Sequence, residues 1–82
     1  MSRVLVKVCG ITEERDAVEA ALLGVDALGF RFSETGPLGV DPGLARRIAE
    51  RLPAWIAKVG VFANEPLIRV LEIARKVGLS AI

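Results

Sequence analysis

Residues 22–30 read LLGVDALGF, and this stretch joins the end of a predicted helix to a predicted strand. Gly24 can take the left-handed conformation that closes a helix, and the short apolar run behind it is typical of a buried strand. A similar phrase occurs at residues 75–82, RKVGLSAI, where Gly78 separates a helical pattern from another apolar run. This weak internal repeat predicts a chain in which helices and strands alternate.

The alternation extends in both directions from this junction. Strands are expected at residues 3–9, 26–32 and 55–62, and a fourth is expected to begin at 79–82. Helices are expected between them, starting at Glu13, at Pro42 and at Glu65 and ending before Gly24, Pro53 and Gly78. Thr12, Asp41 and Asn64 are the predicted N-caps of these helices. One helix between successive strands implies a parallel sheet with right-handed crossovers.

Two folds fit this order, an open doubly wound sheet and a segment of a (βα)8 barrel. The first turn, CGITEE at residues 9–14, lacks the second and third glycines of a dinucleotide-binding turn. Lys7 and Lys58 each fall on the strand face opposite a row of valines, whereas a sheet with helices on both faces is apolar on both. A barrel lumen accepts such polar groups near its mouth. We therefore expect an α/β fold of the (βα)8 TIM-barrel type, with residues 1–82 as the N-terminal portion of one barrel domain: about three βα units plus the start of strand 4.

Composition narrows the range of functions. The 82 residues suffice for one domain, and a net charge of +1 without a basic cluster argues against a nucleic-acid partner. The sequence has no run of ~18 apolar residues and therefore no predicted membrane span. The N-terminal apolar run is interrupted by charged Arg3 and Lys7, so it does not resemble a signal peptide. A single cysteine, Cys9, excludes an internal disulfide and favours a cytoplasmic location. The chain has no histidine, which excludes a His-based triad or zinc site, and we expect no metal.

Three segments carry a family resemblance: KVCGIT at residues 7–12, GVDALGF at 24–30 and KVGVF at 58–62. In this order and spacing they resemble the N-terminal part of phosphoribosylanthranilate isomerase, a (βα)8-barrel enzyme of tryptophan biosynthesis. The likeness covers three of eight βα units and the start of the fourth strand. It implies an Amadori rearrangement of an aminoaldose phosphate to an aminoketose phosphate. It also implies a phosphorylated aminosugar as substrate and no cofactor.

The resemblance implies that Cys9 is the general base that removes the C2 proton of the ribose, while an acid protonates the ring oxygen. Cys9 stands at the end of the first predicted strand, on the barrel face where active sites are built. A free thiol titrates near ~8.5, so a base at neutral pH needs a neighbouring positive charge or helix end. Lys7, two residues earlier on the same strand face, is our candidate for that charge. Lys7 and Arg31 are also candidate substrate-binding residues, although basic residues at strand ends more often extend into solvent. Likewise, an isolated cysteine in a strand is more often a small buried hydrophobic residue than a catalytic one.

Two features depart from the family pattern. Leu38 stands where a serine-proline-arginine motif places the arginine that holds the anthranilate carboxylate, and leucine cannot pair with a carboxylate. Three explanations are open. Arg31 or another basic residue takes the place of the family arginine, the loop aligns differently with the family sequences, or this protein binds the substrate poorly. The family's general acid and phosphate-binding loops come from later strands, so we expect these 82 residues alone to be inactive.

A non-catalytic alternative follows from the same observations. A partial barrel has unpaired strand edges, an open lumen face and a small core. Such a chain is expected to self-associate as a homo-oligomer or to complement a second fragment. A chain that continues beyond Ile82 with a late acidic residue would favour the enzyme, and concentration-dependent oligomers would favour the alternative. A thiol-redox role ranks third, since there is no Cys-x-x-Cys pair.

Overall fold

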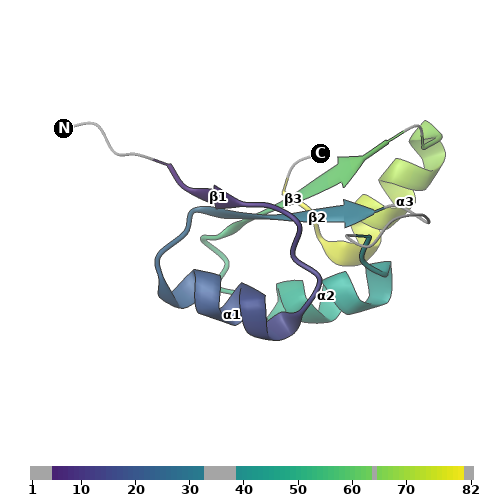
Figure 1. The fold of residues 1–82 in the computed structure, drawn as a ribbon. Helices are drawn as coiled ribbons and strands as arrows, with labels where there is room; N and C mark the ends of the chain where they lie inside the picture. Colours follow the sequence, from purple (N-terminus) through teal and green to yellow (C-terminus); the bar gives the residue numbers. More distant parts are fainter. Residues whose placement is uncertain (1–4, 33–38, 64, 81–82) are drawn as a thin grey trace.

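The computed structural model describes residues 5–32, 39–63 and 65–80. The elements alternate along the chain: β1 (Lys7–Val8), α1 (Glu14–Leu22), β2 (Ala27–Phe32), α2 (Pro42–Arg51), β3 (Ala57–Phe62) and α3 (Leu67–Val77). The strands form one sheet in the order β1-β2-β3, and both strand pairs are parallel. Helices α1 and α2 lie side by side under the sheet, with α3 next to α2 (Figure 1). The predicted alternation and parallel pairing are confirmed.

The strands are shorter than the sequence predicts. β1 has two residues, and β2 and β3 begin one and two residues later than expected. No fourth strand is present among the described residues, and positions 81 and 82 lie outside them. The chain after α3 nevertheless returns to the edge of β3. The Ser80 N–H donates to the Lys58 carbonyl at 2.7 Å, and the Lys58 N–H donates to the Ser80 hydroxyl at 3.0 Å. This edge of β3 is where a fourth parallel strand would pair.

The predicted cap of α2 is confirmed. The Asp41 carboxylate accepts from the Gly43 N–H at 2.9 Å and from the Leu44 N–H at 3.2 Å, which satisfies two donors that lack helical partners. Pro42 is the first helical residue, where its missing N–H has no consequence. Asp41 and Pro42 together fix where this helix begins.

The predicted cap of α1 is wrong by one residue. The helix begins at Glu14, and its N-cap is Glu13, whose side chain makes no capping hydrogen bond. The cause is Ile11, which is buried and donates its N–H to the Gly29 carbonyl at 3.2 Å. This contact holds the chain against β2, so that Thr12 lies too early to be the cap. Asn64, the predicted cap of α3, lies outside the described residues, and Pro66 stands at the N-cap position.

The glycines that close α1 and α3 behave as predicted. Gly24 and Gly78 have φ angles of +85° and +80°, in the left-handed region that L side chains avoid. The Gly78 N–H donates to the Ala74 carbonyl at 2.9 Å, as in a left-handed helix C-cap. Both junctions of the internal repeat therefore turn the chain from a helix toward the sheet.

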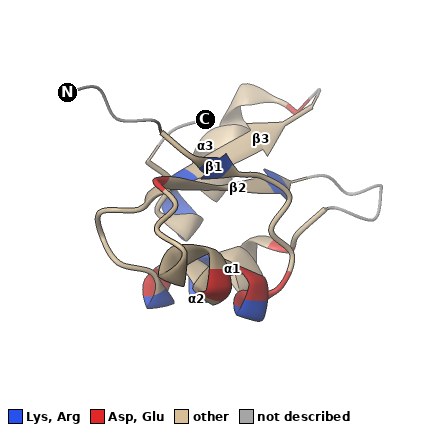
Figure 2. Cartoon of the chain, turned by 60° about the vertical axis from the view of Figure 1, so that its left-hand side comes forward, with Lys and Arg blue, Asp and Glu red and all other residues tan. Residues whose placement is uncertain are grey.

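The core lies between the sheet and the helices. Leu28, Phe30 and Phe32 of β2 point into it, and none is more than 4% exposed. Ile11, Ala17, Ala45, Ile48, Ile56 and Ile73 complete much of it from the helices and loops. Figure 2 shows the charged residues concentrated on the helices. On the three strands the only charged residues are basic, namely Lys7, Arg31 and Lys58.

The expectation that Lys58 faces a lumen is wrong. The register pairs Lys58 with Leu28 and Phe62 with Phe32, so these residues share the helix-covered face. The rings of Phe32 and Phe62 confirm this assignment, since they stack with centroids 5.2 Å apart. Lys58 is only 8% exposed, and its Nζ donates to the Pro53 carbonyl at 2.9 Å. The ammonium therefore lies near the segment that precedes β3, at the amino-terminal end of the strands. Active sites of barrels are built at the opposite, carboxyl end.

Burial gives Lys58 a testable effect on stability. Loss of hydration disfavours its charged form and lowers its pKa from 10.5. At pH values below the folded-state pKa, Lys58 is charged in both the folded and the unfolded protein. Only the folded protein then carries the free-energy cost of burying the charged ammonium. This cost disappears as the pH rises from the folded-state pKa toward 10.5, the unfolded value. Lys58→Met removes this cost together with the hydrogen bond to Pro53, so we expect the unfolding free energy of the variant, relative to the parent, to be more favourable at pH 7 than at pH 10.

Urea denaturation of both proteins at pH 7 and pH 10 measures this difference. Lys76→Met is the matched control, because Lys76 is exposed on α3 and its replacement should change neither value. A Lys58→Met protein that is less stable at pH 7, by an amount independent of pH, would contradict the assignment of a desolvated ammonium.

Candidate active site

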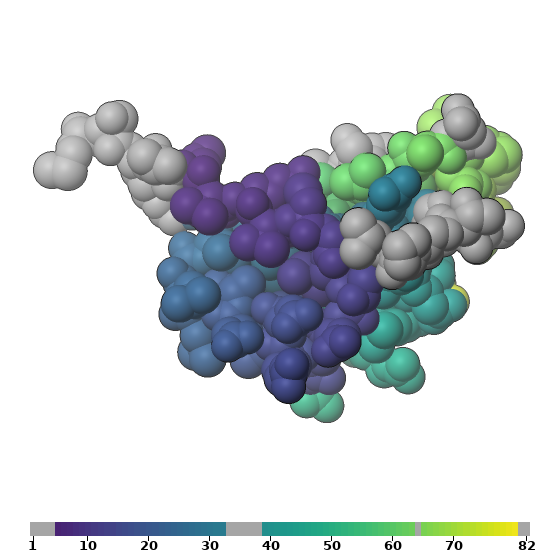
Figure 3. Space-filling model, viewed as in Figure 1, coloured from purple at the N-terminus to yellow at the C-terminus, as the bar shows by residue number. Residues whose placement is uncertain are grey.

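One face of the sheet is covered by none of the helices in the described residues, and we call it the open face. Its strand side chains alternate with those of the core, and the register places Lys7 beside Ala27, Gly29 beside Val59 and Arg31 beside Val61. Lys7, Arg31 and Val61 are exposed, which agrees with a surface that no described helix covers. In Figure 3, the purple segment around β1 and the green end of β3 lie at the surface above the layer of helices.

Cys9 lies immediately after β1, at the carboxyl end of the strand, as the sequence predicts. Gly10 follows with a φ of +78° and turns the chain, and the Ile11 N–H then donates to the Gly29 carbonyl. The backbone is thus attached to β2 on both sides of Cys9. The thiol is free and exposed. This is the end of a parallel strand at which (βα)8 barrels carry their catalytic groups.

The side chains of Lys7 and Cys9 both lie over Gly29. A Cβ atom at Gly29 would lie 3.1 Å from Sγ of Cys9 and 3.4 Å from Cε of Lys7. Both side chains therefore lie over Gly29 on the open face, and the sequence prediction that these residues share a face is confirmed. Sequence reasoning missed Gly29 itself. An isolated glycine inside a strand pattern often marks a close approach, and that signal was available.

Arg31 lies two residues beyond Gly29, on the open face near the end of β2. Its carbonyl accepts from the Val40 N–H at 2.9 Å, and Arg31 forms an isolated parallel bridge with Gly39. Gly39 and Val40 are therefore held against this end of β2. Leu38, the departure from the family pattern, lies outside the described residues.

The open face is electropositive. Lys7 and Arg31 form no ion pair with any residue in the described ranges, and no strand carries a carboxylate. The ion pairs of the described part lie elsewhere, on exposed helix surfaces, as in Arg51–Glu14 and Arg46–Glu50. With no ion-pair partner among the described residues, these two basic side chains share the open face with an exposed thiol and form a surface suited to an anionic ligand.

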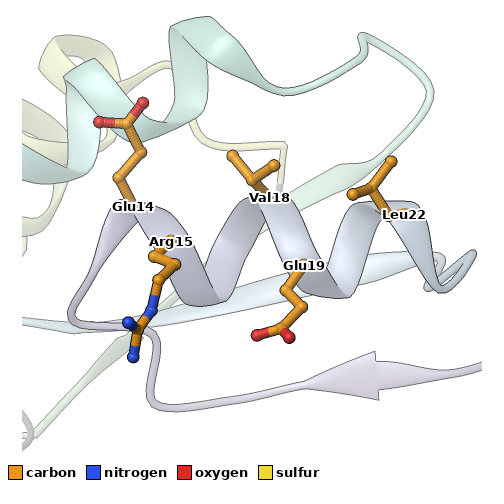
Figure 4. A pocket seen from close by; sticks show the side chains of 5 residues that line it. All are labelled: Glu14, Arg15, Val18, Glu19 and Leu22. Carbon is orange, nitrogen blue, oxygen red and sulfur yellow. The ribbon is translucent and has the colours of Figure 1, made fainter.

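Other surface features do not belong to this site. A groove of about 700 Å³ runs along the outside of α1, where Glu14, Val18 and Leu22 point to one side and Arg15 and Glu19 to the other (Figure 4). It contains none of the predicted site residues. Within the described ranges, no group of His, Cys, Asp or Glu side chains is arranged to hold a metal ion. No helix in those ranges is both long and apolar enough to cross a membrane.

Comparisons with known proteins agree with this geometry. A sequence model of the family described as N-(5'-phosphoribosyl)anthranilate (PRA) isomerase matches residues 6–82. The N-(5'-phosphoribosyl)anthranilate isomerase of Chlorobaculum parvum is 46% identical over 74 residues, which cover 90% of this chain and 34% of the relative. The chain thus spans about a third of the length of that relative.

Solved structures give the same result. The phosphoribosyl anthranilate isomerase of Thermotoga maritima superposes with a TM-score of 0.91 at 42% identity, over 94% of this chain and 38% of that one. A structure of the isomerase in complex with reduced 1-(o-carboxyphenylamino)-1-deoxyribulose 5-phosphate has a TM-score of 0.90 at 42% identity, over 94% and 40% of the two chains. The expected TIM-barrel fold class is therefore confirmed. From the sequence match and the superposition together, the chain belongs to the N-(5'-phosphoribosyl)anthranilate isomerase family, of whose barrel it forms about a third.

Proposed function

We propose that the protein to which this chain contributes is a phosphoribosylanthranilate isomerase of tryptophan biosynthesis, with Cys9 as its general base. The observation that carries the proposal is the position of the Cys9 thiol. It is exposed at the carboxyl end of β1, on the open face, in a chain of this family. We further propose that residues 1–82 form the N-terminal portion of one barrel domain and that the protein is cytoplasmic.

In the proposed reaction, the Cys9 thiolate takes the proton from C2 of the aminoaldose phosphate once the ring has opened. The electron pair of the C2–H bond moves toward the C1–N iminium, and the resulting enolamine tautomerises to the aminoketose. An acid must protonate the ring oxygen for the ring to open. The family resemblance implies that this acid comes from a later strand, so we assign it to another part of the barrel. This chain contributes the base and positive charge.

The substrate class follows from that charge. The compound bound to the related isomerase is a carboxyphenylamino sugar phosphate, so it carries two kinds of anionic group. Arg31 is exposed near the end of β2, and a guanidinium can hold a carboxylate with two parallel hydrogen bonds. We therefore propose that Arg31 supplies the carboxylate contact that Leu38 cannot make, and that Lys7 attracts the substrate toward Cys9. We propose a phosphorylated aminosugar as the small-molecule partner.

The positive charge near Cys9 is measurable without turnover. Iodoacetate is an anion and iodoacetamide is neutral, so the ratio of their alkylation rates at Cys9 reports the local charge. Lys7→Gln and Arg31→Gln are each expected to lower this ratio about two- to fivefold at low salt, and 1 M salt should reduce the effect. Arg47→Gln on α2 is the matched control. A ratio that neither open-face substitution changes would rule out an electropositive face at the thiol.

Transfer of the chain into a complete barrel tests the catalytic proposal. In a chimera, these 82 residues replace the matching segment of the Thermotoga maritima isomerase, with which they superpose at a TM-score of 0.91. We expect a folded barrel that turns over phosphoribosylanthranilate. A chimera that folds and binds the substrate but does not convert it would contradict the proposed role of this chain.

A second proposal concerns assembly. β1 pairs with β2 along one edge, and the flanking Leu5 and Val6 are 75% and 46% exposed. A related structure is that of monomers generated from the dimeric isomerase of Thermotoga maritima. These observations support self-association of the chain, or pairing with a complementary fragment, as a non-catalytic alternative. Sedimentation over a hundredfold concentration range tests it, and a monomer at every concentration would exclude self-association.

A further inference from the structure

We propose that Gly29 is a positioning residue for the Cys9 thiol: the missing side chain leaves the space over which Sγ of Cys9 and the stem of Lys7 both lie. This inference rests on the proposed function only in calling the thiol catalytic. The geometry itself concerns how two neighbouring strands approach each other.

Conformation does not explain a glycine at this position. Gly10, Gly24 and Gly78 have positive φ angles, and Gly29 does not, so its backbone is one that any residue can adopt. Gly29 is also buried, in the middle of β2, where a glycine contributes no side-chain packing. The space above its Cα is therefore the remaining structural reason.

That space is occupied from β1. A Cβ at Gly29 would meet Sγ of Cys9 at 3.1 Å, Cα of Cys9 at 3.3 Å and Cε of Lys7 at 3.4 Å. The first two separations are shorter than an ordinary van der Waals contact between such atoms. An alanine would therefore press on both the side chain and the backbone of Cys9.

The backbone of Cys9 is poorly placed to retreat. Val8 pairs with Leu28 on one side, and on the other the Ile11 N–H donates to the Gly29 carbonyl at 3.2 Å. Movement of the Cys9 backbone away from β2 would strain both interactions. Rotation about the Cα–Cβ bond of Cys9 relieves the 3.1 Å contact at Sγ, and a small shift of the paired backbone relieves the 3.3 Å contact at Cα. Gly29→Ala should therefore move the sulfur out of its position over Gly29, where Cε of Lys7 also lies, while β1 remains paired.

Gly60 provides a matched control in the next strand. A Cβ there would lie 2.5 Å from Cδ1 of Leu79 and 2.8 Å from Cε2 of Phe62, on the helix-covered face. Gly60→Ala is the same chemical change at a glycine that also lacks space. It should disturb the core and leave the open face as it is.

The test measures the ratio of iodoacetate to iodoacetamide alkylation rates at Cys9, on proteins shown to be folded by circular dichroism. Gly29→Ala is expected to lower the ratio two- to fivefold, as Lys7→Gln does. The double variant Gly29→Ala/Lys7→Gln should show no further fall. Gly60→Ala should lower the urea midpoint without changing the ratio. An unchanged ratio in folded Gly29→Ala would overturn the proposal.

A second measurement applies even if Gly29→Ala is unstable. The fall in urea midpoint caused by Gly29→Ala should be smaller in a Cys9→Ala background, because the sulfur that meets the new Cβ is gone. An equal fall in both backgrounds would overturn the proposal. Neither readout depends on isomerase turnover, so an inactive chimera with these results would refute the proposed function and leave the positioning role intact.

Discussion

Serine in place of Cys9 is expected to lower kcat of the barrel chimera by a factor of about 10² to 10⁴, the usual contribution of a positioned general base. A serine hydroxyl has nearly the shape of a thiol, but it does not ionise near neutral pH and so cannot take the C2 proton. Cys9 is exposed, so the substitution should leave folding and substrate KM largely unchanged. Steady-state kinetics of the two chimeras measure the effect.

Val61→Thr is the control for this experiment. It is another near-isosteric change on the open face, at a side chain that is 40% exposed, and it should leave kcat within a factor of about three if the base is elsewhere. Cys9→Ser turnover within a factor of ten of the unaltered chimera would remove Cys9 as the base.

Alanine in place of Phe30 is expected to cost about 3 to 5 kcal/mol of unfolding free energy. The side chain is fully buried between β2 and the helices, and its ring lies 6.4 Å, centroid to centroid, from that of Phe32. Deletion leaves a cavity that the surrounding structure can close only in part, because the backbone of Phe30 is held by pairing with Gly60 of β3. Because small domains have little stability to spare, we expect this variant to be largely unfolded at 25 °C.

Urea denaturation followed by circular dichroism measures this loss. Trp55→Ala removes a larger ring from a site that is 63% exposed, and it should change stability by less than about 0.5 kcal/mol. A Phe30→Ala protein that loses less than about 1 kcal/mol would show that the core is not centred on β2.

Local chemistry made much of the fold predictable. Asp41 and Pro42 define the start of α2. Gly24 and Gly78 define the ends of α1 and α3 through a backbone conformation that other residues avoid. Alternation of these local units implies a parallel sheet, because a helical crossover returns each strand in the same direction. The order and the type of every described element therefore follow from short stretches of sequence.

Contacts between distant residues were not predictable in the same way. Val59 and Val61 suggested a helix-facing row on β3, yet the register with β2 places them beside Gly29 and Arg31 on the open face. A one-residue change in register reverses the faces of a strand, and nothing within β3 reveals its register. Lys58 was assigned to the wrong face for this reason. Thr12 was misplaced because a contact of Ile11 with β2 delays the helix.

In the candidate site, too, local features were predictable from the sequence and contacts between strands were not. The location of Cys9 at a strand end follows from the sequence pattern, whereas its role as a base comes from the family resemblance and remains a prediction. The position of Cys9 and Lys7 over Gly29 depends on how closely two strands approach, which only the three-dimensional structure shows.

The central claim is that substrate binds against the open face at Cys9. Its most direct test is the alkylation rate of Cys9 in the chimera, read by peptide mass spectrometry, with and without saturating reduced 1-(o-carboxyphenylamino)-1-deoxyribulose 5-phosphate. We predict that the bound compound covers the thiol and slows alkylation at least about tenfold. An unchanged alkylation rate, with binding of the compound shown independently by calorimetry, would contradict the claim.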